Sequence, residues 1–210
     1  MAQPRSAFAL RIFGLGLTIL AVGLTIWLLT RPEPGNNRPV TASGEVLIGG
    51  PFELVDQQGQ TRRDSDFRGR HMLVYFGYTY CPDICPTSLM AMTQALDIRG
   101  RADSGLAEEV VPLFITIDPE RDTVQALAAY APNFHANLVA LTGTAEQVAA
   151  AAEAYRVYYA KAETGEASEY LMDHSSFIYL MDPEGRYLAH FPHSATAESI
   201  AKSLKAHIGS

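Results

Sequence analysis

The sequence predicts a mixed α/β domain with helices on both faces of its sheet, behind an apolar N-terminal segment. Three observations predict this arrangement. Apolar runs typical of buried strands alternate with segments of helical periodicity. The only two cysteines among the 210 residues follow one of these runs directly. A stretch of 19 residues without a charge lies near the start. We therefore divide the chain into a short N-terminus (1–11), the apolar stretch (12–30), a linker (31–43) and a domain (44–210).

The apolar stretch Ile12–Thr30 predicts a membrane-spanning helix. At about 1.5 Å per residue it would reach about 28 Å, close to the roughly 30 Å hydrocarbon core of a bilayer. Arg5 and Arg11 precede it without an acidic residue, which predicts a cytoplasmic N-terminus and a domain on the opposite side. A cleaved signal peptide is the alternative, but its apolar region would be only about 7–15 residues long. The proline-containing linker that follows disfavours a buried core helix.

The charge of the domain excludes one class of partner. Residues 1–40 carry four arginines and one glutamate, and the whole chain has a net charge of −7, so the rest of the chain carries −10. A domain this acidic is not expected to bind nucleic acid, which requires a basic surface. The acidity either favours cationic partners or simply keeps the domain soluble.

The strands are predicted from apolar runs that end at turn residues. The run that begins at Phe52 ends at the turn residues Asp56–Gly59, and the run that begins at Val110 ends at Asp118-Pro119. The last two runs lie on either side of Asp182–Gly185, a sequence typical of a hairpin turn. The run Met72–Phe76 is apolar throughout, which is typical of a strand buried on both faces. The expected strands are Phe52–Val55, Met72–Phe76, Val110–Ile117, Phe177–Met181 and Arg186–Phe191.

The helices are predicted from apolar periodicity together with capping residues. Gly100 is expected to end the first helix, because glycine is common just after a helix C-terminus. Thr144 is the expected N-cap of the third, with Gln147 at the spacing of a capping box. The last is amphipathic. The expected helices are Thr87–Arg99 behind Pro86, Thr123–Tyr130, Thr144–Tyr155 and Ala197–Ile208.

The cysteine loop, residues 77–86, reads Gly-Tyr-Thr-Tyr-Cys-Pro-Asp-Ile-Cys-Pro. Each cysteine precedes a proline, which disfavours helical backbone, so we expect Cys81 and Cys85 to be extended and the helix to begin at Pro86. Cys85 would then lie at or beside the N-cap, where the helix dipole favours a thiolate. A strand, a cysteine loop and a helix in an alternating α/β chain predict a thioredoxin-like fold with its chemistry at this loop.

The paired thiols could bind a soft metal or exchange a disulfide. A purely structural disulfide is disfavoured, because closing so short a loop removes little chain entropy. Two thiolates suit Cu(I), but a stable three-coordinate site needs another donor. His174 is the best candidate, since it precedes the strand Phe177–Met181 in a loop that would face the cysteines. Thioredoxin-like reductases ordinarily have a proline at this position, so the histidine favours metal binding.

These motifs resemble those of the Sco (SenC) family of membrane-anchored copper proteins, over about Gly49 to Ile208. The resemblance implies that Cys81, Cys85 and His174 bind copper, as Cu(I) or Cu(II). It implies that the partner is the CuA-bearing subunit II of cytochrome c oxidase. Together with the charge flanks, it implies a single-pass protein of the cell inner membrane with its domain in the periplasm, or in the equivalent intermembrane space. The matching residues are 77–86, Asp118–Thr123, Tyr170, Asp173–Ser175 and Tyr179–Asp182.

Three functions remain open at this point. The first is a copper chaperone that passes the metal to the oxidase. The second is a thiol-disulfide oxidoreductase, in which Cys81 or Cys85 attacks a partner disulfide and the other cysteine resolves the mixed disulfide. The third is a redox or copper sensor. A peroxidase is disfavoured, because the single peroxidatic cysteine in a threonine-rich loop is absent.

Other conspicuous residues are expected to be structural. Asp122 either caps the following helix or tunes the metal together with Asp118, and Arg121 is expected to form an ion pair. Asp173 either orients His174 or faces water. The remaining histidines are expected at the surface or in packing, at His71, His135, His190, His193 and His207. Four methionines are either soft metal ligands or, as we expect, part of the core, and Met172 is near His174 in the sequence. They are Met90, Met92, Met172 and Met181, of which Met172 replaces a valine common in the resembling family.

Overall fold

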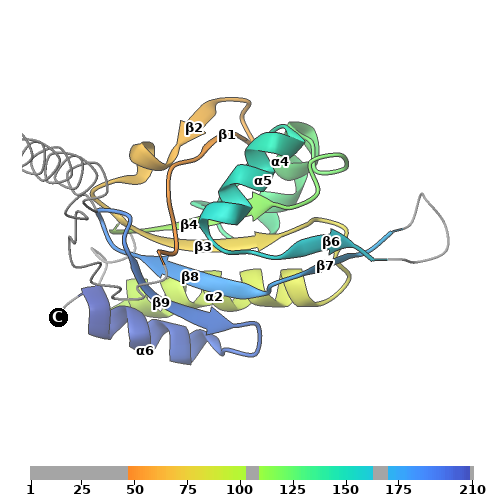
Figure 1. Cartoon of the computed structure of the whole chain (residues 1–210). Coiled ribbons are helices and arrows are strands. Elements are labelled where there is room, and N and C mark those ends of the chain that lie inside the picture. The colour runs from red at the N-terminus through yellow and green to blue at the C-terminus, as the bar shows by residue number, and fades with distance from the viewer. Residues whose placement is uncertain (1–46, 103–108, 163–169, 209–210) are drawn as a thin grey trace, which may run out of the picture. The chain divides into compact units, whose positions relative to one another are not determined.

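The computed structural model describes residues 47–102, 109–162 and 170–208. They form a seven-stranded mixed sheet with helices against it and a separate two-stranded ribbon (Figure 1). The predicted mixed α/β class is therefore confirmed. The predicted N-terminus (1–11), apolar span (12–30) and linker (31–43) lie outside the described residues. Within the described ranges, no helix combines the length and the apolar character needed to cross a membrane.

The sheet is built around three parallel strands, β3 (His71–Gly77), β4 (Val110–Thr116) and β5 (Val139–Thr142). Antiparallel strands extend it on both sides, in the order β2-β1-β5-β4-β3-β8-β9. β3 and β4 are buried along almost their whole length, as expected for strands covered on both faces. The antiparallel strands are β1 (Glu53–Asp56), β2 (Thr61–Arg63), β8 (Phe177–Met181) and β9 (Tyr187–Pro192).

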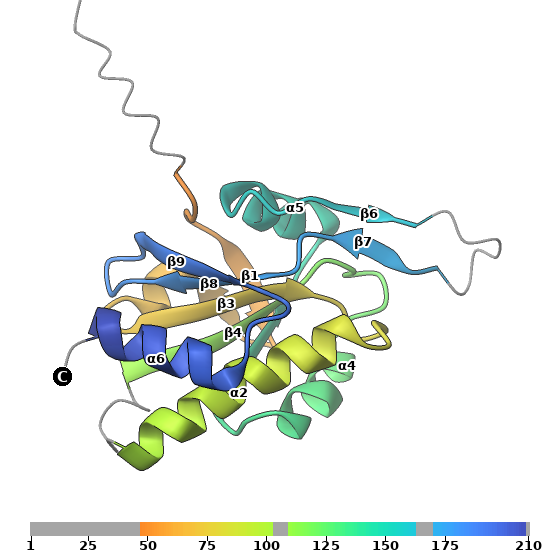
Figure 2. The same ribbon diagram turned by 90° about the horizontal axis from the view of Figure 1, so that it is seen from below.

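The helices pack against the two faces of this sheet. α2 and α6 lie side by side on one face, as Figure 2 shows, and α5 lies on the other face (Figure 1). Thr144 and Gln147 form the predicted capping box of α5. The helices are α2 (Ile84–Ala102), α4 (Val124–Tyr130), α5 (Ala145–Ala154) and α6 (Ala197–Ile208), with short 3₁₀ turns η1 (Asp64–Phe67) and η2 (Ala131–Asn133).

Helix α2 begins earlier than predicted. Its first hydrogen bond runs from the N–H of Thr87 to the carbonyl of Asp83, 3.1 Å away, so Cys85 and Pro86 belong to its first turn. Proline is tolerated there because the N–H groups of the first turn have no intrahelical acceptor. The expectations that Cys85 is extended and that the helix starts at Pro86 are therefore wrong.

The C-terminal end of α2 also differs from the prediction. The helix continues through Gly100, which does not adopt the left-handed conformation of a glycine cap. A glycine inside a helix costs only about 1 kcal/mol relative to alanine. Packing of α2 along α6 and the sheet outweighs this cost, so the local stop signal fails.

The predicted hairpin turn between β8 and β9 is present. Gly185 has φ +75°, and its N–H donates to the carbonyl of Asp182, 2.8 Å away. The carboxylate of Asp182 accepts hydrogen bonds from the backbone N–H and the side chain of Arg186, at 2.7 and 2.6 Å. Burial raises the pKa of Asp182, but these donors outweigh burial and leave the pKa below its ordinary value. The turn thus fixes the outer edge of the sheet beside α6.

A two-stranded ribbon, β6 (Tyr159–Lys161) with β7 (Met172–His174), stands apart from the main sheet. Its antiparallel register pairs His174 with Tyr159. The ribbon, β2 and β5 were not predicted, because strands of three or four residues are too short for periodicity alone to reveal them. The equally short β1 was predicted because turn residues follow it directly. The ribbon matters for function, since it carries His174 to the cysteine loop.

Candidate metal centre

The two cysteines lie where β3 passes into α2. The N–H of Cys85 points to Sγ of Cys81, 3.3 Å away, so this sulfur accepts a hydrogen bond from a first-turn N–H that has no intrahelical partner. Sγ of Cys85 lies 3.5 Å from Nε2 of His174. Cys85 is fully buried and Cys81 is partly exposed, and neither is in a disulfide. The three predicted ligands therefore come together from the cysteine loop and the ribbon.

The surroundings favour a thiolate at Cys81 rather than at Cys85. A hydrogen bond from the Cys85 side chain, helped by His174 and by backbone N–H groups, lowers the pKa of Cys81 to about 3. The pKa of Cys85 is raised because its thiol donates a hydrogen bond to Cys81 and because the side chain is buried. The expectation that the helix dipole acts on Cys85 is wrong in this respect. The N–H of Cys85, in the first turn of α2, points at Cys81 instead.

The imidazole of His174 is oriented as a ligand requires. Nδ1 lies 3.2 Å from the carbonyl oxygen of Ser175, and Nε2 faces Cys85. If Nδ1 carries the proton and donates to this carbonyl, the lone pair of Nε2 faces the sulfur, which is the tautomer that a metal needs. Asp173 is exposed, so of its two expected roles it faces water rather than holding the imidazole.

The donor set fits copper. Two thiolates and an imidazole are soft and borderline ligands that suit both copper oxidation states. Among the described residues, no group of three or more histidine, cysteine or carboxylate side chains is close enough to hold an ion as it stands. Contacts of Cys81 with Cys85, and of both with His174, nonetheless connect the three. Loss of thiol protons and small side-chain movements would complete the site.

Tyr78 ties the cysteine loop to the ribbon and was missed in the sequence. Its hydroxyl oxygen accepts a hydrogen bond from the N–H of Met172, 3.2 Å away and two residues before His174. Its carbonyl accepts the N–H of Cys81 at 3.3 Å. Tyr78 therefore links the cysteine loop, at Cys81, to the ribbon, at Met172. Its position between Gly77 and Thr79 in the cysteine loop is the only sequence signal that could have indicated this role.

Asp122 anchors the cysteine loop from the interior. Its fully buried carboxylate accepts hydrogen bonds from the N–H and the hydroxyl of Thr79, at 3.0 and 2.5 Å, and from the hydroxyl of Thr116 at 2.6 Å. Burial raises the pKa of Asp122 in spite of these donors. Of the two roles left open for Asp122, capping of α4 does not occur, because the side chain of Thr123 caps that helix. Tuning of the metal stays a prediction. Asp122 instead fixes the chain two residues before Cys81.

Arg121 forms the expected ion pair and also an aromatic cluster. Its Nε lies 2.5 Å from the carboxylate of Asp118, which in turn accepts a hydrogen bond from the hydroxyl of Tyr170 at 2.7 Å. The guanidinium carbon lies 3.7 Å from the ring centroid of Tyr170 and 4.6 Å from that of Tyr80. Asp118 thus serves this cluster beside the cysteine loop.

The remaining residues expected to be structural agree with the structure, with one exception. His135 faces Asp97 on α2, whereas His190 and His207 contact near neighbours in the sequence, Tyr187 and Ser203. His71 is half-buried and His193 is exposed. Met92, Met172 and Met181 are buried as expected. Met90 is half exposed, so its expected place in the core is wrong. It follows the buried Leu89 and so lies on the outer side of α2.

Comparison with known proteins extends this picture. The SCO1/SenC family profile matches residues 40–209. The chain is 42% identical over 186 residues to the mitochondrial SCO2 homolog of Bos taurus, covering 87% of this chain and 69% of that protein. It is 41% identical over 193 residues to a SCO2-like protein of Rickettsia prowazekii, covering 89% of this chain and 91% of that protein. The crystal structure of Arabidopsis thaliana ScoI with copper bound matches with a TM-score of 0.72 at 41% identity, covering 77% of this chain and 98% of that one. These matches span the sheet, the cysteine loop and the ribbon, and the chain belongs to the SCO1/SenC family.

Proposed function

We propose that this protein is a membrane-anchored copper chaperone for assembly of the CuA centre in subunit II of cytochrome c oxidase. The contact between Sγ of Cys85 and Nε2 of His174, 3.5 Å apart, carries the proposal. A dithiol that only exchanged disulfides would have no use for an imidazole facing its buried sulfur. The related Arabidopsis thaliana ScoI, whose structure holds copper, supports the choice of metal.

The three ligands would contribute differently. Cys81, with its lowered pKa and partial exposure, would meet the incoming ion first, as a thiolate. Cys85 would bind from the interior, releasing its proton as it does so. Nε2 of His174 would supply the third donor from the ribbon. Thiolates of the acceptor protein could then replace these ligands one at a time.

A thiol-disulfide oxidoreductase is the second candidate, and the low pKa of Cys81 favours it. In that reaction the Cys81 thiolate attacks a disulfide of the partner, and one partner cysteine leaves as a thiolate. Cys85 then loses its proton and attacks the sulfur of Cys81, which releases the second partner thiolate and leaves a Cys81–Cys85 disulfide. The partner gains two electrons and this protein loses two.

Replacing His174 separates the two candidates. In the purified full-length protein, His174→Ala should lower Cu(II) affinity by about tenfold or more, because it removes one of three ligands. Cu(I) affinity should fall less, since two thiolates still bind Cu(I) in a near-linear arrangement. The rate of exchange with a small disulfide should change little. Competition with chelators and stopped-flow thiol assays measure these quantities.

The matched control is His193→Ala, which removes an exposed histidine from the turn before α6. It should leave copper affinity unchanged. Cells whose only copy carries His174→Ala should assemble oxidase that is deficient in CuA, and added copper should restore it only partly. Full oxidase activity in these cells at limiting copper would reject the chaperone and favour the reductase.

The proposed membrane anchor rests on the uncharged stretch 12–30 and on Arg5 and Arg11 before it. In sealed inside-out vesicles from the inner membrane, a protease added outside should leave the domain intact, because the domain would lie in the lumen. Immunoblotting of the C-terminal region measures this, and detergent lysis should make the domain accessible. Digestion in intact vesicles would show that the proposed orientation is reversed.

A further inference from the structure

Two buried hydroxyl groups close to the cysteine pair lack hydrogen-bond partners. Tyr75 on β3 is fully buried and Ser88 on α2 is 1% exposed. Neither Oη of Tyr75 nor Oγ of Ser88 has a partner among the described residues. Buried hydroxyls are nearly always paired, because an unpaired one has lost its hydrogen bonds to water without replacement. Two such groups beside one functional site indicate an acceptor that is not yet in its final state.

Ser88 is unusual for a helical serine. Serine and threonine inside helices commonly donate to a carbonyl three or four residues earlier. Thr93 on the same helix does so, with Oγ1 2.9 Å from the carbonyl oxygen of Leu89. Ser88 makes no such bond. It lies three residues after Cys85, so the two side chains share a face of α2.

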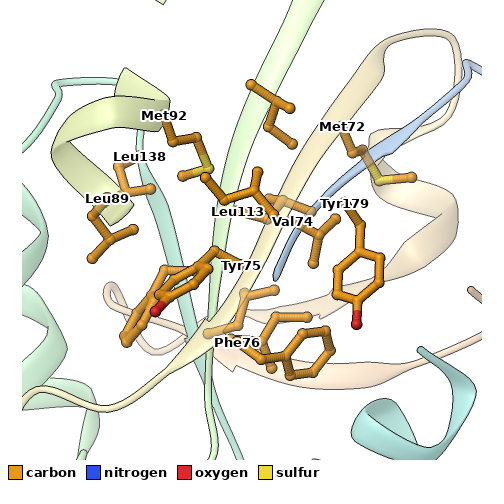
Figure 3. Packing of buried hydrophobic residues seen from close by; sticks show 14 of the residues in the cluster. Met72, Val74, Tyr75, Phe76, Leu89, Met92, Leu113, Leu138 and Tyr179 are labelled. Carbon is orange, nitrogen blue, oxygen red and sulfur yellow. The ribbon is translucent and has the colours of Figure 1, made fainter. Parts of the chain in front are cut away.

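Tyr75 approaches the same sulfur from the sheet. A Cβ on Gly77 would lie 2.9 Å from Sγ of Cys85 and 2.9 Å from Cε1 of Tyr75, so both atoms border the space above Gly77. The ring is held in place by Phe114, at a centroid distance of 6.4 Å, and by the edge of His174 at 6.3 Å. Figure 3 shows Tyr75 among the core side chains on the side where Leu89 of α2 lies.

Tyr75 stays protonated in this environment and so keeps its donor. Burial raises its pKa, and the sulfur of Cys85 raises it further. The hydroxyl of Ser88 is close enough to influence the same group in the opposite direction. The three groups Tyr75, Ser88 and Cys85 therefore interact, although the two hydroxyls have not reached hydrogen-bond geometry with any acceptor.

We propose that the hydroxyls of Tyr75 and Ser88 donate hydrogen bonds to the sulfur of Cys85 when that sulfur is a copper-bound thiolate. A thiol is a weak acceptor. A thiolate is a strong acceptor and satisfies both. Such bonds draw electron density from the sulfur, weaken its donation to Cu(II) and raise the potential of the Cu(II)/Cu(I) couple. Tyr75 and Ser88 are thus positioning residues, and this role rests on the proposed function.

Tyr75→Phe and Ser88→Ala remove one hydroxyl each with little change in shape. In the copper-loaded full-length protein, each should shift the sulfur-to-Cu(II) charge-transfer absorption to longer wavelength and lower the Cu(II)/Cu(I) potential. The double variant should shift both further. Absorption spectra and mediated redox titration measure these effects, neither of which depends on delivery activity.

The controls remove hydroxyls of the same kinds away from Cys85. Thr93→Val acts on the hydroxyl bonded to Leu89, and Tyr179→Phe acts on a buried ring that packs against Phe76. Both should keep the parent spectrum and potential. Unchanged values in the double variant with copper bound, or equal shifts in the controls, would overturn the inference alone. Absence of copper binding in the parent would overturn it together with the proposed function. If Tyr75→Phe fails to fold, Ser88→Ala gives the same test.

Discussion

Oxidation of Cys81 and Cys85 to a disulfide should remove nearly all copper binding, with a loss of affinity on the order of a thousandfold or more. The disulfide removes both thiolates and leaves His174 as the only one of the three ligands. The fold should persist, because the two cysteines are only four residues apart, Cys85 in the first turn of α2 and Cys81 just before it. Chelator competition with the diamide-oxidised and the reduced protein measures the loss, and circular dichroism monitors the fold.

A variant with both cysteines replaced by serine serves as the control for this experiment. It should bind copper as weakly as the disulfide form, and diamide should have no further effect on it. Mass spectrometry verifies the disulfide in the oxidised sample. Undiminished copper binding by that verified form would rule out a site built on two thiolates.

Gly77→Ala should damage both stability and the site. Its Cβ would lie 2.9 Å from Sγ of Cys85, 2.9 Å from Cε1 of Tyr75 and 3.1 Å from Cε2 of Phe114, all from fully buried side chains. Overpacking of this kind costs about 1–3 kcal/mol of unfolding free energy. Because the sulfur of Cys85 must move, copper affinity should also fall, by about tenfold or more. Urea denaturation and chelator competition measure the two effects.

Gly59→Ala is a matched control for the stability effect. Gly59 has φ +79° and open space around its missing Cβ, so alanine there strains the backbone by about 1 kcal/mol. This residue lies in the turn between β1 and β2. It should lower stability while leaving copper affinity at the parent value. Equal copper affinity in both glycine variants would show that Gly77 does not position Cys85.

Elements with strong local signals were predictable from the sequence. The apolar runs of β3 and β4 and the capping box at Thr144 and Gln147 each depend on residues close together in the chain. The limits of α2 were not predictable in this way. Proline after Cys85 and the glycine at position 100 both suggested boundaries, but first-turn tolerance and packing against α6 decided them.

The candidate ligands could be predicted from the sequence, but the hydrogen bonds that hold the cysteine loop and the ribbon in place could not. The link between Thr79 and Asp122 joins residues 43 positions apart, and the link between Tyr78 and Met172 spans 94. Neither has a periodic or capping signature. The assignment of the thiolate to Cys81 depends mainly on the hydrogen bond from the Cys85 side chain and on the burial of Cys85, neither of which has a sequence signature.

The separate ribbon has a consequence for the release of the metal. Cys85 lies in the first turn of a helix that packs on the central sheet, and Cys81 lies just before that helix, whereas His174 lies on a two-stranded ribbon that is separate from the main sheet among the described residues. The imidazole is therefore held by a two-stranded element rather than by the seven-stranded sheet. If copper is the cargo, an acceptor would displace the imidazole first, because moving a two-stranded ribbon disturbs less of the fold than moving the main sheet. Two sulfurs would meanwhile retain the ion, so the transfer would pass through no stage at which copper is loose in water.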